Sequence, residues 1–152
     1  MSRPSWDDYF MNMAINASSR SKDPHTKVGA CIVKDNRVLS LGYNGAPRKF
    51  PDNVIPNNKD RSLPLMYQKY PYIVHAELNA ILNYRGNISD FDGATIYVTV
   101  SPCYECVKAL AQVGIKEVIY IKEYNKEVWD ISKIILNNCN IKFRKLEGDY
   151  EA

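Results

Sequence analysis

The stretch ATIYVTVSPCYECVKALAQVGIKEVIYI, from Ala94 to Ile121, decides the fold. Its opening run, Ala94–Val100, consists mainly of β-branched residues and predicts a strand. A helix is expected over Cys103–Val113, and Gly114 ends it because glycine adopts the left-handed conformation at helix ends without strain. Lys116–Ile121 predicts another strand. A strand, a helix and a strand in succession imply parallel strands with the helix packed across them.

The segments on either side extend this unit in both directions. After it, Lys126–Asn138 predicts a helix and Ile141–Leu146 a last strand. Before it, Asp35 and Asn36 form a turn between two apolar runs, which predicts a hairpin. The sequence thus predicts an α/β fold with a mixed sheet of about five strands. The remaining expected elements are the hairpin strands Val28–Val33 and Arg37–Tyr43 and the helices Trp6–Arg20 and His75–Tyr84.

The composition is that of an ordinary globular protein. The 152 residues include 20 basic and 17 acidic side chains, which gives a net charge of +3, and 45% are hydrophobic. These values predict a single domain over residues 1–152 and exclude disordered, collagen-like and low-complexity chains. No apolar run reaches the roughly 18 residues that a membrane span needs, and the first residues lack a signal-peptide pattern. We therefore expect a cytoplasmic protein that does not bind a membrane.

Two short motifs carry the chemistry. They are HAE at residues 75–77 and PCYEC at residues 102–106, and each stands where a helix is expected to begin. Ser101 is a good N-cap and Pro102 suits the first helical position. The two cysteines of PCYEC are therefore expected in the first turn, on one face of the helix. A helix N-terminus also favours the thiolate form of cysteine, which is the form that binds metals.

One histidine and two cysteines form a ligand set that suits zinc. His75, Cys103 and Cys106 would leave the fourth position of a tetrahedral zinc ion open for water, as in catalytic sites. Zinc lowers the pKa of that water to about 7, and Glu77, two residues beyond the histidine, can move protons beside it. H-x-E followed by P-C-x-x-C is also the signature of zinc nucleobase deaminases. The sequence therefore predicts a catalytic zinc site.

The cysteine pair also has other interpretations. C-x-x-C occurs as a redox pair, although this interpretation leaves His75 and Glu77 without a role. It also forms half of a closed, four-ligand zinc site, for which His25, Cys31 or Cys139 would have to supply the fourth ligand. Cys31 lies in an apolar strand and Cys139 at the end of an amphipathic helix, so both are expected to be packed side chains.

The chain resembles the zinc-dependent cytidine deaminase superfamily and, within it, the deoxycytidylate (dCMP) deaminases. HAE and PCxxC are shared across the superfamily. GYNG followed by an insertion, and HAELNAI as a whole, are more particular to the dCMP deaminases. The resemblance extends from Trp6 to Lys145 and includes RSKDP (20–24), VGACIV (28–33), GYNG (42–45), KYPYIVHAELNAI (69–81), SPCYEC (101–106) and GIKEVIY (114–120).

The resemblance implies a three-layer α/β/α fold and hydrolysis of dCMP to dUMP and ammonia, a reaction that feeds dTMP synthesis. It assigns zinc binding to His75, Cys103 and Cys106. Glu77 would protonate ring nitrogen 3 of the base and later the departing amine. The other implied substrate contacts are the backbone of Ala76 and Ser101 at the amino group, Asn44 at the deoxyribose, Val28 against the base, and Tyr124, Lys27 and His25 as candidate donors to the 5′-phosphate.

The resemblance also implies regulation and assembly. Many dCMP deaminases are hexamers that dCTP activates together with Mg²⁺ and that dTTP inhibits, through a site near the subunit interface. The proline-rich stretch 44–71 is expected to be a long loop, and it contains neither the cysteine nor the histidine that a second, structural zinc would need. We therefore expect a homohexamer with one zinc ion per subunit. The candidate allosteric residues are basic and aromatic side chains of that loop: Arg48, Lys49, Lys59, Arg61 and Tyr67.

Other functions remain open at this point. The enzyme could act on dCTP, in addition to dCMP or instead of it. Deaminases of tRNA adenosine or of single-stranded DNA cytidine share the motifs, but a net charge of +3 is small for tracking a polynucleotide, so no nucleic-acid partner is expected. A zinc-stabilised binding module is disfavoured by Glu77, because a closed structural site has no use for an acid beside an open position.

Overall fold

The strands that the structure describes within residues 2–151 are β1 (Gly29–Lys34), β2 (Arg37–Tyr43), β3 (Thr95–Val100), β4 (Glu117–Lys122) and β5 (Lys142–Lys145). In this computed structural model they form one mixed sheet in the order β2-β1-β3-β4-β5. β1 pairs antiparallel with both β2 and β3, whereas β3, β4 and β5 run parallel to one another. The predicted hairpin and the predicted parallel part are both confirmed.

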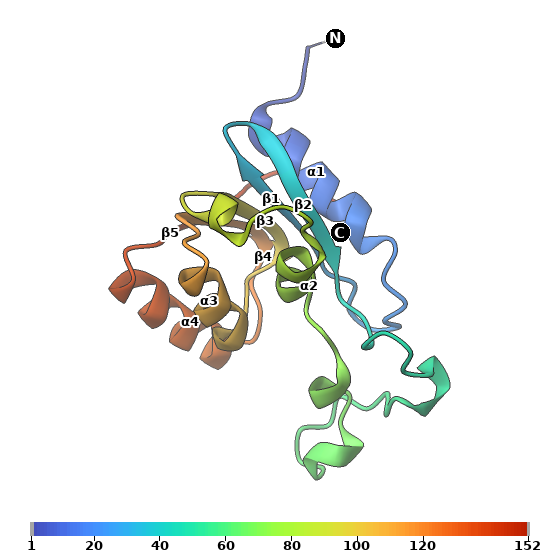
Figure 1. The fold of residues 1–152 in the computed structure, drawn as a ribbon. Helices are drawn as coiled ribbons and strands as arrows, with labels where there is room; N and C mark the ends of the chain where they lie inside the picture. Colours follow the sequence, from blue (N-terminus) through green and yellow to red (C-terminus); the bar gives the residue numbers. More distant parts are fainter. Residues whose placement is uncertain (1, 152) are drawn as a thin grey trace.

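Helices cover both faces of the sheet (Figure 1). They are α1 (Trp6–Ser18), α2 (Ala76–Asn83), α3 (Tyr104–Gln112) and α4 (Lys126–Asn138). α1 packs on one face, against β1 and β3, while α2, α3 and α4 cover the other face. The fold is therefore the expected three-layer α/β/α arrangement.

Each face of the sheet has its own apolar core, because side chains alternate along the central strands. In β1, Ala30 and Ile32 pack toward α2, while Cys31 and Val33 pack toward α1. Successive residues of a strand point to opposite faces, so a strand covered on both sides needs apolar residues at every position. The continuous apolar runs that predicted buried strands are explained in this way, and the packed position of Cys31 is confirmed.

The helix that begins with the HAE motif lies directly on β2. A Cβ atom at Gly42 would be 2.4 Å from the backbone oxygen of Ala76 and 2.4 Å from the backbone nitrogen of Ala80, so glycine is needed for this close approach. The hydroxyl of Ser40 donates to the Ala80 carbonyl at 2.6 Å and fastens the same contact. The first glycine of GYNG therefore helps to place the start of α2.

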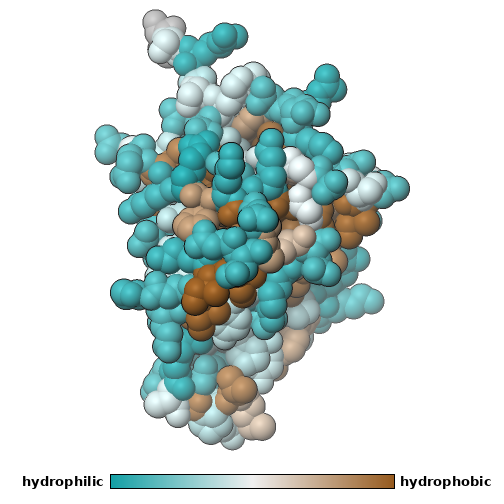
Figure 2. Space-filling model, turned by 90° about the vertical axis from the view of Figure 1, so that its left-hand side faces the viewer, coloured by the Kyte–Doolittle hydropathy of each residue, from teal (hydrophilic) through white to brown (hydrophobic). Residues whose placement is uncertain are grey.

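Some side chains that were expected to be packed lie on the surface. Cys139 is the clearest case: it is the C-cap residue of α4 and it is exposed, so the prediction of a packed side chain is wrong. α4 contacts the rest of the fold along one side only, and Ile131 and Ile134 on it are also exposed. Figure 2 shows the face that carries α3 and α4 as mostly hydrophilic, with separate apolar patches. Among the described residues, no helix has the length and apolar character that crossing a bilayer requires.

The insertion at residues 44–71 has little regular structure. It contains short 3₁₀ turns, Asp52–Val54 and Leu65–Tyr67 among them. An isolated bridge between Gly45 and Val74 brings its two ends together. In Figure 1 this segment (green) projects away from the sheet beyond α2.

Candidate active site

The HAE motif opens α2. His75 is the N-cap residue of the helix, in an extended conformation, and Ala76 is the first helical residue. The His75 carbonyl accepts the backbone N–H of Asn79 at 3.0 Å, which is the first hydrogen bond of the helix. Glu77 consequently lies in the first turn with only 4% of its surface exposed. The positive end of the helix dipole favours a negative charge at this position.

The PCYEC motif opens α3, which begins at Tyr104, one residue later than the expected range, with its N-cap two residues later than predicted. Cys103 is the N-cap residue in place of Ser101, and its carbonyl accepts the N–H of Val107 at 2.9 Å. The Ser101 hydroxyl is occupied elsewhere, because it accepts the backbone N–H of Tyr124 at 2.6 Å and joins the ends of β3 and β4. Pro102 therefore precedes the helix, and the predictions for the cap and the first helical position are wrong.

His75, Cys103 and Cys106 bring three donor atoms together. His75 Nδ1 lies 3.2 Å from Cys106 Sγ and 3.3 Å from Cys103 Sγ, and all three donor atoms lie within 4.8 Å of one another. A tetrahedral zinc ion with Zn–N bonds of about 2.0 Å and Zn–S bonds of about 2.3 Å holds such atoms roughly 3.5–3.8 Å apart. One nitrogen and two sulfur atoms at these separations fit zinc and leave a fourth position for water. Glu77 is buried beside them and lines the same pocket as His75 and Cys103.

Burial and hydrogen bonding shift the pKa values of these groups. Burial raises the pKa of Glu77 to about 7, so its carboxyl can gain and lose a proton near neutral pH. The hydrogen bond from Cys106 lowers the pKa of Cys103 to about 4, and the resulting thiolate raises the pKa of His75 to about 9. The same hydrogen bond raises the pKa of Cys106. A metal that binds here must displace these protons.

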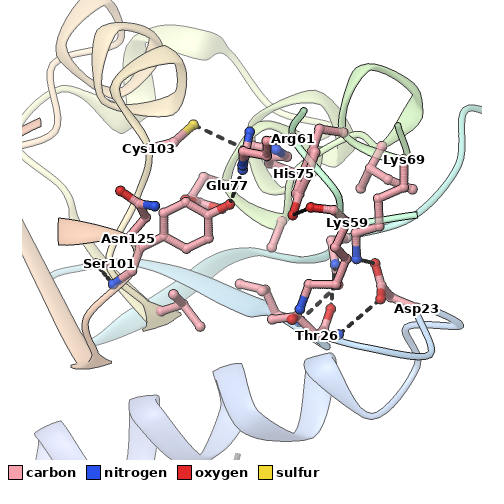
Figure 3. A pocket seen from close by; sticks show the side chains of 17 residues that line it. Asp23, Thr26, Lys59, Arg61, Lys69, His75, Glu77, Ser101, Cys103 and Asn125 are labelled. Atoms are coloured by element: carbon pink, nitrogen blue, oxygen red, sulfur yellow. Dashed lines mark hydrogen bonds and ion pairs between the residues drawn. The ribbon is translucent and has the colours of Figure 1, made fainter. Parts of the chain in front are cut away.

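His75, Cys103 and Glu77 line a pocket of about 270 Å³ near the carboxyl ends of β3 and β4, and the Cys106 sulfur lies within 4.8 Å of the other two donor atoms. This is the edge at which ligands bind in open α/β sheets. In Figure 3, Cys103 and Asp23 lie on opposite sides of the pocket, with His75 and Glu77 between them. The residues that were expected to contact the base or the sugar all line it: Val28, Asn44, Ala76 and Ser101.

Two residues that were expected to serve regulation, Lys59 and Arg61, line this same pocket together with Tyr124. The Arg61 guanidinium donates to the Tyr124 hydroxyl at 3.0 Å and lies 3.6 Å from the centre of the Tyr70 ring. Among the ion pairs of residues 2–151, neither cation has an acidic partner. An arginine, a lysine and a phenolic hydroxyl around one pocket are suited to an anion such as a phosphate.

The remaining candidates for phosphate binding and regulation lie elsewhere. His25 and Lys27 line a neighbouring hollow that opens beside the ends of β3 and β4. Arg48, Lys49 and Tyr67 are exposed on the insertion and do not line the pocket. The structure thus brings Tyr124 together with Lys59 and Arg61, and it places the other five apart from them.

Sequence reasoning missed a buried ion pair in the pocket wall. Lys69 Nζ lies 2.6 Å from Asp23 Oδ2, and the two side chains are only 8% and 3% exposed. Asp23 also accepts the backbone N–H groups of His25 and Thr26. Burial acts to raise the pKa of Asp23, but the bonds from Lys69 and the backbone outweigh it and hold this pKa below its ordinary value. Asp23 lies in the motif RSKDP and Lys69 begins KYPY. The two residues are 46 positions apart, so no local sequence pattern indicates that they form a pair.

Asn44 supports the same wall of the pocket, since its side chain and that of Asp23 both bind the backbone of Thr26. Its Oδ1 accepts the backbone N–H of Val28 at 2.9 Å, and its Nδ2 donates to the Thr26 carbonyl at 2.9 Å. These two bonds use one lone pair and one N–H of an amide that has two of each. Asn44 can therefore hold the start of β1 in place and bind a ligand at the same time.

An α/β/α sheet whose carboxyl edge holds a His/Cys/Cys cluster beside a buried glutamate defines a class, the zinc-type nucleobase deaminases. Comparison with known proteins narrows that class. The chain belongs to the cytidine and deoxycytidylate deaminase family, because the model for the cytidine and deoxycytidylate deaminase zinc-binding region matches residues 4–122. It is therefore an enzyme, a hydrolytic nucleotide deaminase.

Individual relatives agree with this assignment. The chain is 42% identical to human deoxycytidylate deaminase over 143 residues, which is 92% of this chain and 79% of that protein. It is also 42% identical to the deoxycytidylate deaminase of Mycobacterium phage D29 over 129 residues, 81% of this chain and 99% of that one. Among solved structures, the dCMP deaminase of cyanophage S-TIM5 in complex with dCMP and dUMP aligns with a TM-score of 0.75 at 30% identity, over 96% of this chain and 100% of that chain.

Proposed function

We propose that the protein hydrolyses dCMP to dUMP and ammonia at the pocket that contains Glu77. The observation that carries this proposal is that two groups of residues meet at one pocket. The first is the metal cluster of His75, Cys103 and Cys106 with the buried acid Glu77, and the second is the pair of cations Lys59 and Arg61 with the Tyr124 hydroxyl. The first group suits hydrolysis of an amino group on a base, and the second suits a phosphate. Relatives named deoxycytidylate deaminase, and a related enzyme solved with dCMP and dUMP, support the same substrate.

The metal cluster and Glu77 carry out the chemistry in this proposal. Zinc held by His75, Cys103 and Cys106 would lower the pKa of a bound water to about 7 and so supply hydroxide at neutral pH. Glu77 takes the proton of the attacking water and gives it to ring nitrogen 3 as oxygen bonds to carbon 4. It then takes the remaining proton from the new hydroxyl on carbon 4 and gives it to the amine. The carbon–nitrogen bond breaks, ammonia leaves, and the carbonyl of the uracil product forms. A pKa of about 7 suits a group that must act as base and acid in one cycle.

The remaining pocket residues orient the substrate. We assign the exocyclic amino group to the backbone of Ala76 and Ser101, the base to the face of Val28, and the deoxyribose to Asn44, all of which line the pocket. We assign the 5′-phosphate to Arg61, Lys59 and Tyr124, in place of His25 and Lys27, which line a different hollow. A phosphate between an arginine and a lysine gains charge-assisted hydrogen bonds that a nucleoside cannot make.

The test is a direct assay of the zinc-loaded protein with dCMP, deoxycytidine, dCTP and a cytidine-containing oligonucleotide, in which ammonia and the uracil product are both measured. We expect dCMP to be deaminated with the highest kcat/KM. The Glu77→Gln variant should bind zinc and lose most of this activity. Deamination of the oligonucleotide alone, or of dCTP alone, would contradict the proposal.

We further propose a cytoplasmic homohexamer that is activated by dCTP with Mg²⁺ and inhibited by dTTP, as the resemblance to the dCMP deaminases implies. Of the residues first considered for regulation, Arg48, Lys49 and Tyr67 remain candidates, because they are exposed outside the pocket. Deamination rates at subsaturating dCMP, with and without each effector, test the regulation. Sedimentation velocity tests the hexameric assembly. A hyperbolic response that neither nucleotide changes would contradict regulation, and a monomer would contradict the assembly.

A further inference from the structure

The segment that carries Lys59 and Arg61, the pocket cations without an acidic partner among residues 2–151, is a closed loop, residues 58–70, which we call the cationic loop. Its ends are joined by a hydrogen bond from the backbone N–H of Lys69 to the carbonyl of Asn58, at 3.0 Å. Two residues near the start of this loop, Lys59 and Arg61, line the pocket. Figure 1 shows that this part of the insertion stands away from the sheet, so packing against the sheet does not set its shape.

Gln68 is the internal support of the cationic loop. It is only 4% exposed, whereas Leu65, Met66 and Tyr67 just before it are 58–70% exposed. Its side-chain Nε2 donates to two backbone carbonyls of the same loop, that of Leu63 at 2.7 Å and that of Arg61 at 3.3 Å. One buried amide therefore holds the backbone of the residue whose guanidinium enters the pocket.

We propose that Gln68 is a positioning residue for substrate, acting through Arg61. This inference rests on the proposed function, because it assumes that Arg61 binds the 5′-phosphate. The Arg61 guanidinium keeps its contacts with the Tyr124 hydroxyl and the Tyr70 ring only while its backbone is held at the right place. Losing the Gln68 donor would leave two carbonyls without their partner, and the loop backbone would turn them toward water.

The effect belongs to substrate binding and leaves the chemical step intact. Gln68 lies outside the residues that line the pocket, and the hydrogen bonds of its side chain go to Leu63 and Arg61. Arginine has many side-chain conformations, so a support that orders it before the substrate arrives lowers the cost of binding. Gln68 should consequently affect KM for a phosphorylated substrate and leave kcat nearly unchanged.

The experiment compares zinc-loaded Gln68→Met, which keeps the length of the side chain and removes the donor, with the wild type. We expect KM for dCMP to rise roughly 10-fold, as loss of a pair of buried hydrogen bonds predicts, with kcat within about 2-fold. The kcat/KM for deoxycytidine, which has no phosphate, should stay the same. Leu65→Gln is the matched control, since Leu65 is in the same loop and 70% exposed, and it should leave both substrates unaffected.

A double-mutant cycle with Arg61→Ala separates positioning from a general structural role. If Gln68 acts through Arg61, Gln68→Met should raise KM for dCMP little further once Arg61 has been replaced by alanine. The inference would be overturned if Gln68→Met raised KM for dCMP by the same factor in the wild type and in Arg61→Ala. It would also be overturned if Gln68→Met left KM unchanged. Gln68→Glu, which keeps the shape but replaces the donor with an acceptor, should reproduce the effect of Gln68→Met. Failure of both variants to fold would also overturn it, because Gln68 would then support the whole protein and not the loop.

Failure of the proposed function is visible separately. If the wild type does not deaminate dCMP, or if Arg61→Ala leaves KM for dCMP unchanged, then the assignment of substrate or phosphate is wrong before Gln68 is considered. If the wild type and Arg61→Ala behave as proposed and Gln68→Met behaves like the wild type, the positioning role alone is wrong.

Discussion

The floor and the mouth of the pocket are built in different ways. The floor consists of His75, Glu77, Cys103 and Cys106, which stand at the first residues of two helices and are buried or half-buried there. The mouth consists of Arg61 and Lys59 with Tyr124, and its two cations come from a loop that stands away from the sheet. Changes in the floor should therefore remove chemistry, whereas changes in the mouth should weaken binding of the phosphate.

The largest expected effect follows from removal of the metal. Cys106→Ser, or treatment of the wild type with a strong chelator, should bring activity to background, because the floor then lacks the ion that its three donors fit. Added Zn²⁺ should restore the chelated wild type. Cys139→Ser is the matched control: Cys139 is exposed on α4, so this variant should keep both its zinc content and its rate. Full activity in zinc-free protein would contradict the assignment.

Next in size is the loss of the proton carrier. Glu77→Gln should reduce kcat about 10³-fold, within the usual range for a general acid–base residue. Zinc content and KM for dCMP should change little, because Glu77 lies beside the three donors and is not one of them. Metal analysis checks the zinc content, and steady-state kinetics on the same sample check kcat and KM. A variant that loses zinc would make Glu77 part of the metal site.

The buried ion pair of Lys69, in the cationic loop, with Asp23, between α1 and β1, should matter for stability. Lys69→Met leaves the buried Asp23 carboxylate without its partner and should lower the free energy of unfolding by about 3 kcal/mol. Lys22→Met is the control, since the Lys22–Asp52 pair is 81% and 61% exposed, and such surface pairs contribute under about 1 kcal/mol. Urea unfolding measures both. Equal effects of the two variants would contradict the buried role.

This stabilisation should also depend on pH in a defined direction. The pKa of Asp23 is lowered in the folded protein, so the pair contributes fully above the unfolded-state pKa of about 3.9. Its contribution is lost as the pH falls from there through the folded-state pKa. The stability difference between the wild type and Lys69→Met should therefore narrow in acid. If the stability difference between the two proteins instead widened in acid, a group other than Asp23 would control the pH dependence.

A smaller effect is expected from the hydroxyl that orients Arg61. Tyr124→Phe removes the acceptor of the 3.0 Å hydrogen bond and keeps the ring, so KM for dCMP should rise only about 5-fold. The kcat should stay near that of the wild type, because the Ser101 hydroxyl is bound by the backbone of Tyr124 and not by its side chain. A large fall in kcat would instead place the Tyr124 hydroxyl next to the reacting atoms.

The floor could be predicted from the sequence because its residues obey local rules. HAE and PCYEC each open a helix, and the apolar runs around them specify strands that are covered on both faces. A helix brings residues three or four positions apart to one face, so spacing alone indicates that Cys103 and Cys106 act together. The N-cap of α3 does not follow from local rules, because the Ser101 hydroxyl accepts the backbone N–H of Tyr124, a residue distant in sequence.

The mouth could not be predicted, because tertiary contacts decide it. Arg61 and Tyr124 are 63 positions apart, and nothing in a proline-rich loop without periodicity indicates which of its basic residues turns inward. Composition alone does not distinguish Lys59 and Arg61 from Arg48 and Lys49, although only the first two line the pocket. The exposure of Cys139 has a similar cause, because an amphipathic pattern does not say how much of a helix its neighbours cover.

The division of labour between floor and mouth is tested most directly by the ratio of kcat/KM for dCMP to that for deoxycytidine, in the wild type and in Arg61→Ala. We predict that Arg61→Ala lowers kcat/KM for dCMP roughly 30-fold, as loss of a charge-assisted contact to phosphate implies, and leaves that for deoxycytidine within about 2-fold. The ratio should fall accordingly. An equal loss for both substrates, or no loss for dCMP, would contradict the account.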